Sequence, residues 1–248
     1  MRHPWLALLL LVPGLARGDP LAIGAASSLT DVLPRLARAF TKTTGAAAPV
    51  ASFGSSGTVA RQVVSGAPLD VVVLADPGLA RALTRRGLLE PGSLRCVATN
   101  RLSLVVPRKS RTVASWADLG APAAPRTALG DPAHVPAGAL ARRHLEALGL
   151  WTAVLPRAVF AASARQALAY ARRAEVDAAV VFRTDALSAG SDVREVDTAP
   201  LAARYVAGVV VGTPQPADAR RFTTFLAGPA GQALFAEAGF GACPGREP

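Results

Sequence analysis

Cysteine and histidine are scarce in this chain of 248 residues, which contains two cysteines and three histidines. His3 lies at the extreme N-terminus, and the other two histidines are His134 and His144. A zinc site needs three or four ligands at closer spacing, so the sequence predicts no site for a bare metal ion. Cys96 and Cys243 allow one disulfide or two free thiols, and the sequence leaves both possibilities open.

Long apolar runs are also absent, although hydrophobic residues make up 51% of the chain. No segment reaches the about 18 consecutive apolar residues that a membrane-spanning helix requires. Residues 1–18, MRHPWLALLLLVPGLARG, have the basic start, short apolar core and small-residue end of a secretory signal peptide, with cleavage expected before Asp19. No cysteine follows that point, which argues against a lipid anchor. We therefore expect a soluble, exported mature protein.

Lysine is nearly absent, since Lys42 and Lys109 are the only lysines among 27 basic residues. The formal net charge of +10 is typical of nucleic-acid-binding proteins. However, the arginines are scattered along the chain, and no cluster of aromatic and basic residues is present that could stack bases. A nucleotide-binding P-loop is excluded as well, because no lysine follows the glycines of segment 53–63, FGSSGTVARQV. We expect no nucleic-acid partner.

Short apolar strands and amphipathic helices alternate along most of the chain, which predicts an α/β fold with mainly parallel sheets. Pro34 lies inside the first expected helix and should bend it. The expected strands are residues 21–25, 49–53, 70–76, 102–107, 126–130, 158–160, 177–182 and 204–212. The expected helices are residues 29–40, 58–66, 77–87, 138–148, 164–173, 222–226 and 232–236.

Three of the expected helix starts carry serine. Ser28–Asp31 and Ser163–Gln166 fit the capping-box pattern, with serine at the cap, and the third start is the run Ser55–Thr58. Each start offers free backbone N–H groups and the positive end of a helix dipole, which together suit an anion. A serine hydroxyl there either caps its helix or donates to a ligand. One helix start alone does not decide between these roles.

A serine hydrolase is the alternative interpretation of segment 53–63. The run Gly54–Gly57, GSSG, is one residue shorter than the G-x-S-x-G nucleophile elbow. Ser56 would also need His134 or His144 as its base, and neither lies in a recognisable motif. His134 belongs to Gly130–Gly138, GDPAHVPAG, a rigid turn that leads into a helix. A secreted hydrolase that uses Ser56 therefore stays a distant alternative.

Four segments, taken in order, resemble the periplasmic molybdate-binding proteins, which are the substrate-binding components of molybdate ABC transporters. They are AASSLTDVL, SFGSSGTVARQVVSGAPLDVVVLAD, GDPAHVPAG and AAVVFRTDA, and the resemblance extends from about Leu21 to Phe240. It implies a type II periplasmic binding-protein fold, in which two α/β lobes close on a small oxyanion in a cleft at the hinge. The signal peptide would be residues 1–18, lobe 1 residues 19–101 plus 204–248, and lobe 2 residues 102–203.

The resemblance also implies a site in which hydroxyl and amide groups hold the anion without any cation or cofactor. Carried over residue by residue, the side chains of Ser28 and Ser56 and the backbone N–H groups of Ala137 and Ala164 would bind it. Phe182 stands where this family commonly has a tyrosine that reaches the anion. The loss of one hydrogen bond to a charged group, about 1.5–3 kcal/mol, would weaken binding about ten- to a hundredfold.

The ligand class follows from counting donors and acceptors. A site made only of N–H and O–H donors suits an oxyanion without protons, whereas phosphate at neutral pH carries a proton that needs an acceptor. Molybdate and tungstate are therefore expected, with sulfate or thiosulfate as alternatives, because the sequence does not give the cavity size. The resemblance further implies a periplasmic protein without enzymatic activity that delivers the anion to an inner-membrane ABC permease, and we expect it to act as a monomer.

Overall fold

The computed structural model describes residues 19–121 and 125–244, so the predicted signal peptide, residues 1–18, lies outside the described residues. Within the described ranges, eight strands form one mixed sheet in the order β2-β1-β3-β8-β4-β7-β5-β6. The strands are β1 (Ala22–Ala26), β2 (Val50–Gly54), β3 (Val71–Leu74), β4 (Arg95–Pro107), β5 (Thr127–Gly130), β6 (Ala158–Ala161), β7 (Ala178–Phe182) and β8 (Val193–Val209).

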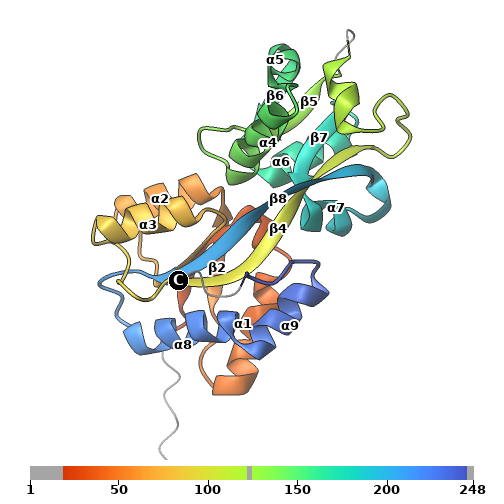
Figure 1. Ribbon diagram of the computed structural model, residues 1–248. Coiled ribbons are helices and arrows are strands. Elements are labelled where there is room, and N and C mark those ends of the chain that lie inside the picture. Colours follow the sequence, from red (N-terminus) through yellow and green to blue (C-terminus); the bar gives the residue numbers. More distant parts are fainter. Residues whose placement is uncertain (1–18, 122–124, 245–248) are drawn as a thin grey trace, which may run out of the picture.

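Two long strands connect the two lobes of the molecule, since β4 and β8 run through both of them (Figure 1). Lobe 1 contains β1–β3 with the helices α1 (Leu33–Thr44), α2 (Ser56–Val64), α3 (Pro77–Arg85), α8 (Pro216–Ala227) and α9 (Pro229–Glu237). Lobe 2 contains β5–β7 with α4 (Pro136–Ala147), α5 (Trp151–Val154), α6 (Ala164–Arg172) and α7 (Arg183–Ser188). The outer strands pair in parallel, β1 with β2 and β3, and β5 with β6 and β7. In contrast, β4 and β8 run antiparallel to their neighbours, so the sheet is less uniformly parallel than expected.

In lobe 1, helices cover both faces of the sheet, which explains why β3 is apolar along its whole length. Val72 and Leu74 pack in one cluster with Val59 of α2. Val71 and Val73 point to the opposite face, in the main core that also holds residues of α1, α8 and α9. Because side chains alternate along a strand, both sets are fully buried.

Lobe 2 repeats this arrangement with other helices. Val180 of β7 joins Leu140 of α4 in the main core, whereas its neighbour Val181 packs with Ala167 of α6 in a separate cluster on the other face. The expected α/β architecture is therefore confirmed, with a helix–sheet–helix sandwich in each lobe. No helix among the described residues is long and apolar enough to cross a membrane.

The first helix begins later than expected. Residues Ser27–Leu29 form a short 3₁₀ helix, η1, and α1 begins at Leu33. Pro34 therefore lies in the first turn of α1, where its missing N–H has no helical partner to lose. The prediction that Pro34 lies inside a helix that it bends was wrong.

The two cysteines form a disulfide that ties the C-terminal segment to the start of β4. Cys96 and Cys243 are joined with their Cα atoms 6.0 Å apart. Beside the disulfide, Thr99 and Gly241 exchange two backbone hydrogen bonds of 2.8 and 2.9 Å. Of the two possibilities that the sequence left open, the structure contains the disulfide.

Candidate functional site

The carboxyl ends of the parallel strands bring the predicted binding residues to the interface between the lobes. Ser28 follows β1 and Ser56 follows β2 in lobe 1, whereas Ala137 and Ala164 follow β5 and β6 in lobe 2. In α/β folds, ligands bind beyond the carboxyl ends of such strands. Phe182 is the last residue of β7 and is buried.

Two close approaches join the lobes at these helix starts. The start of α2 touches the loop before α4, because a Cβ placed on Gly57 would lie 2.6 Å from the carbonyl oxygen of His134. On the other side, η1 contacts α6, whose Arg165 forms an ion pair with Asp31. Ser56 therefore lies next to one inter-lobe contact and Ser28 next to the other.

Ser55, and not Ser56, is the residue that caps α2. Ser55 is the N-cap of α2, and its Oγ accepts a hydrogen bond of 3.1 Å from the N–H of Thr58. Ser56 is buried, and its Oγ accepts a hydrogen bond of 2.9 Å from the N–H of Ala75. The Ser56 hydroxyl is thus held as an acceptor by the backbone, which leaves its proton for another partner.

Ser28 does not cap a helix, so the predicted capping box is wrong. No side chain caps η1, and the N-cap position is Ala26. Instead, the Ser28 Oγ lies 2.7 Å from the hydroxyl of Tyr205 in a buried hydrogen bond. The carboxylate of Asp31 does not return to the helix start but pairs with Arg165 of the other lobe.

The backbone amides of Ala137 and Ala164 lie in the first turns of α4 and α6 and are buried. The N-cap of α6 is Ser163, as expected, and its Oγ accepts from the N–H of Gln166 at 3.1 Å. In the part of the chain that the structure describes, neither alanine N–H has a hydrogen-bond partner. Free amides at the positive end of a helix dipole are available to an anion.

Tyr205 and Asn100 are polar residues of this region that the sequence analysis missed. Tyr205 belongs to β8 and is fully buried, and its ring lies 5.9 Å from that of Phe182. Asn100 of β4 donates a hydrogen bond of 3.4 Å from Nδ2 to the Tyr205 hydroxyl. A signal was available, since a tyrosine in the apolar strand YVAGVVV needs a buried partner for its hydroxyl.

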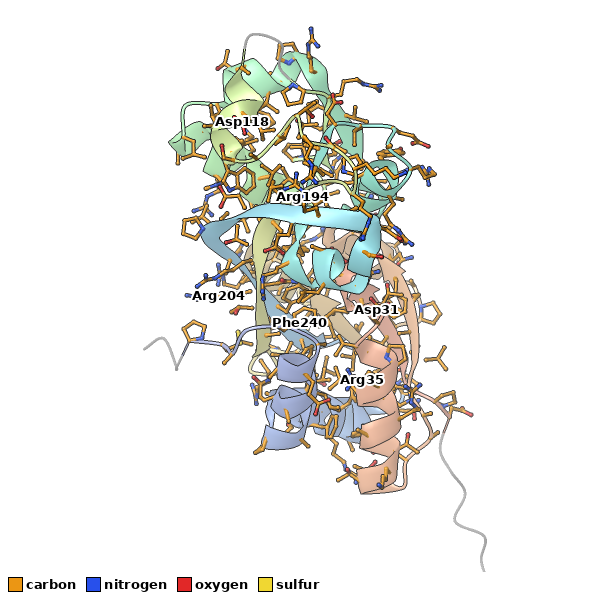
Figure 2. All side chains as sticks on the ribbon, turned by 90° about the vertical axis from the view of Figure 1, so that its right-hand side faces the viewer. Asp31, Arg35, Asp118, Arg194, Arg204 and Phe240 are labelled. Atoms are coloured by element: carbon orange, nitrogen blue, oxygen red, sulfur yellow. A yellow bond between two sulfur atoms is a disulfide. The ribbon has the colours of Figure 1, made fainter. Side chains whose placement is uncertain are left out.

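Arg165, the residue after Ala164, forms an ion pair with a buried carboxylate. The Nε of Arg165 is 2.7 Å from Oδ1 of Asp185, whose side chain is fully buried. Burial raises the pKa of Asp185 to about 6, and the adjacent Arg165 guanidinium partly opposes this rise. Because the same guanidinium also pairs with Asp31, it connects the lobes; Figure 2 labels Asp31 where the two lobes meet.

Two hollows lie along the line where the lobes meet. One of about 490 Å³ is lined by Ser28, Asp31, Arg165 and Thr184, among other residues. The other, of about 560 Å³, lies between α2, α3 and the loop around His134. Residues 19–121 and 125–244 place no group of three or more His, Cys, Asp or Glu side chains so as to hold a metal ion.

In the described residues, the structure pairs neither His134 nor His144 with the Ser56 hydroxyl, as the hydrolase alternative would require. His144 is buried in α4, where its ring packs edge-on against Trp116 with centroids 4.5 Å apart. Burial lowers the pKa of His144, and the nearby Asp197 opposes this effect. Among the described residues, the Ser56 hydroxyl pairs with the Ala75 N–H and with no histidine.

Comparisons with known proteins agree with this geometry. Residues 21–241 match the family model described as bacterial extracellular solute-binding protein. The chain is 33% identical to the molybdate-binding protein ModA of Haemophilus influenzae, covering 94% of this chain and 96% of that protein. It is also 33% identical to ModA of Escherichia coli, with 97% and 99% covered.

Solved structures show the same fold. The periplasmic molybdate-binding protein of Azotobacter vinelandii superimposes with a TM-score of 0.80 at 27% identity, covering 90% of this chain and 99% of that one. The sulfate-binding protein SubI of Mycobacterium tuberculosis gives a TM-score of 0.77 at 17% identity, with 90% and 86% covered. At that lower identity, the likeness to SubI concerns the fold alone.

Proposed function

Since this chain belongs to the family of bacterial extracellular solute-binding proteins, we propose that it binds molybdate between its two lobes. Relatives that match nearly its whole length at 33% identity are molybdate-binding proteins, and so is a solved structure at 27% identity. The type II fold, with helix starts from both lobes at one interface, supports the same ligand class. Tungstate, with the same charge and shape, is proposed as a second ligand.

The structural observation that carries this proposal is the hydrogen bond from the Ala75 N–H to the Ser56 Oγ. Because the backbone already donates to this oxygen, the buried hydroxyl faces the ligand as a donor. We assign Ser28, Ala137 and Ala164 as further hydrogen-bond donors. Phe182 is assigned as an apolar side chain that lines the site without donating a hydrogen bond. A site of donors has no acceptor for the proton of phosphate, which should therefore bind weakly.

The lobe boundaries and the delivery step belong to the same proposal. We place lobe 1 at residues 19–101 plus 204–244 and lobe 2 at residues 102–203 of the described chain. The β4–β8 register shifts between Arg101 and Ser103, and an irregular crossing of this kind suits a hinge. The closed protein would act without a cofactor or a chemical step, as a periplasmic monomer that delivers its anion to an ABC permease.

Calorimetric titration tests which anion the protein binds. We expect the mature protein to bind molybdate and tungstate tightly, sulfate more weakly because of its smaller size, and phosphate at least about a hundredfold more weakly than molybdate. The physical reason is the unpaired donor that a protonated phosphate oxygen would meet in a site of donors. Equal binding of phosphate and molybdate would contradict the assigned site. Binding of sulfate more tightly than molybdate would make sulfate the ligand, while the ligand class would still be an oxyanion without protons.

The variant Phe182→Tyr tests the missing donor. Its added hydroxyl should strengthen molybdate binding about tenfold, since a hydrogen bond to a charged group is worth about 1.5–3 kcal/mol. Phe160→Tyr is the matched control, because Phe160 lies on the edge strand β6 and is 46% exposed. Calorimetry on both variants measures the effect; unchanged or weaker binding by Phe182→Tyr would argue against Phe182 as part of the site.

A further inference from the structure

Tyr205 lies at the centre of a buried polar chain that runs from one lobe to the other. Its hydroxyl is 2.7 Å from the Oγ of Ser28 and accepts from the Nδ2 of Asn100 at 3.4 Å. The same Nδ2 donates to the Oγ1 of Thr184 in α7 at 2.8 Å. Ser28 belongs to lobe 1, Tyr205 and Asn100 to the connecting strands, and Thr184 to lobe 2.

The aromatic neighbours of Tyr205 fix where its hydroxyl lies. Its ring packs edge-on against Phe240 at 5.4 Å and lies tilted against Phe182 at 5.9 Å. Figure 2 labels Phe240 close to the junction of the lobes. Since the side chain of Tyr205 is fully buried, its hydroxyl must satisfy its hydrogen bonds within the protein.

Counting protons gives the direction of each hydrogen bond in this buried polar chain. An amide nitrogen donates only, so the Tyr205 oxygen accepts from Asn100. Burial raises the pKa of Tyr205 above its ordinary value, so the hydroxyl keeps its proton at physiological pH. The Oγ of Ser28, 2.7 Å from the Tyr205 hydroxyl, is placed to accept that proton. Ser28 then has to use its own proton for a third partner.

We infer that Tyr205, itself oriented by Asn100, is a positioning residue that holds the Ser28 hydroxyl as a donor toward the bound anion. The Tyr205 hydroxyl would thus donate to the Ser28 oxygen, as the backbone N–H of Ala75 donates to the Ser56 oxygen. Both serine oxygens are then already engaged as acceptors, which makes the site selective for anions that bring no proton. This inference rests on the proposed function, because it needs an anion next to Ser28.

A double-mutant cycle with calorimetric titration of molybdate tests this role. Tyr205→Phe removes one oxygen and keeps the ring, and we expect it to weaken binding about tenfold. In a Ser28→Ala background, the same change should have almost no effect, because its consequence passes through the Ser28 hydroxyl. Tyr170→Phe is the matched control: it deletes the same atom from the other tyrosine, which is partly buried on α6 beneath the Arg173 guanidinium, and should leave binding unchanged.

Each outcome of the cycle has a definite meaning. Equal losses in the two backgrounds would overturn the inference, since Tyr205 would then act independently of Ser28. Unchanged affinity with a lower melting temperature would also overturn it and leave Tyr205 a purely structural residue. If Tyr205→Phe does not fold, Asn100→Ala serves instead, with a weaker loss that again vanishes in the Ser28→Ala background; a loss that persists there would overturn the inference.

The first titration separates this inference from the proposed function. If the unaltered protein binds none of molybdate, tungstate, sulfate or phosphate, the proposed function fails and the positioning role fails with it. If the protein binds molybdate and Ser28→Ala weakens it, but Tyr205→Phe has no effect, the positioning role alone is overturned.

Discussion

Replacing Arg165 by methionine is expected to lower the free energy of unfolding by about 2 to 3 kcal/mol at pH 7, measured by urea denaturation without anion. The Arg165 guanidinium lies 2.7 Å from the fully buried carboxylate of Asp185. Removing it leaves a buried charge without its partner, which typically costs about 3–5 kcal/mol. The expected loss is smaller here because Asp185 can take up a proton instead of staying charged.

The pH dependence of this loss identifies Asp185 as its source. Burial raises the pKa of Asp185 from an ordinary 3.8 to about 6 in the folded protein. A raised carboxyl pKa stabilises the folded state at low pH, and that contribution is lost as the pH rises from about 4 through 6. Without Arg165, the pKa of Asp185 should rise further, so the loss of folding stability continues to higher pH. The variant should therefore be most destabilised near pH 8 and least near pH 5.

Two further variants complete the Arg165 experiment. Adding Asp185→Asn to Arg165→Met should restore most of the lost stability and remove the pH dependence, because no buried charge remains. Arg172→Met is the matched control, since Arg172 lies on the same helix α6 but pairs with Asp192 at the surface, with both side chains about half exposed. Its loss should stay below about 1 kcal/mol. A loss from Arg165→Met that is the same at pH 5 and pH 8 would contradict the role of Asp185.

The sequence predicted the parts of the fold that depend on neighbours along the chain. The apolar run around β3, the strand–helix alternation and the cap at Ser163 depend on local periodicity and helix-start chemistry. The strand ends then place Ser28, Ser56 and the two amides at one interface, as parallel pairing requires. The family resemblance is what connected these local features into one predicted binding site, because capping patterns alone do not indicate a ligand.

The remaining features could not be predicted because they join residues that are distant in sequence. The partner of Ser28 is Tyr205, 177 residues away, and no local pattern predicts that such a hydroxyl leaves its helix start. The ion pair of Arg165 and Asp31 spans 134 residues. Pro34 is a local case that still failed, because its effect depends on where the helix begins. The short helix η1 delays the start of α1 to Leu33, which puts Pro34 in the first turn, where it costs no hydrogen bond.

Removing the disulfide is expected to lower the free energy of unfolding by about 3 to 5 kcal/mol, with a fall in Tm of roughly 10 °C for a domain of this size. Cys96 and Cys243 are 147 residues apart in sequence, so the bond closes a loop that includes most of the chain. In the chain-entropy account, this restricts the unfolded ensemble strongly, because the stabilisation grows with loop length. Thermal and urea unfolding of the Cys96→Ser/Cys243→Ser variant measure it.

The folded state should change little, because other contacts hold the same segment. The two backbone hydrogen bonds between Thr99 and Gly241 keep the C-terminal segment on β4, and Phe240 packs against Tyr205 in the core. We therefore expect the double serine variant to bind molybdate within about twofold of the unaltered protein, provided that both are measured well below their unfolding transitions. Reducing the unaltered protein with dithiothreitol should reproduce the loss of stability. An unchanged unfolding midpoint would exclude loop closure as a source of stability, and a large loss of affinity would mean that the disulfide shapes the binding site itself.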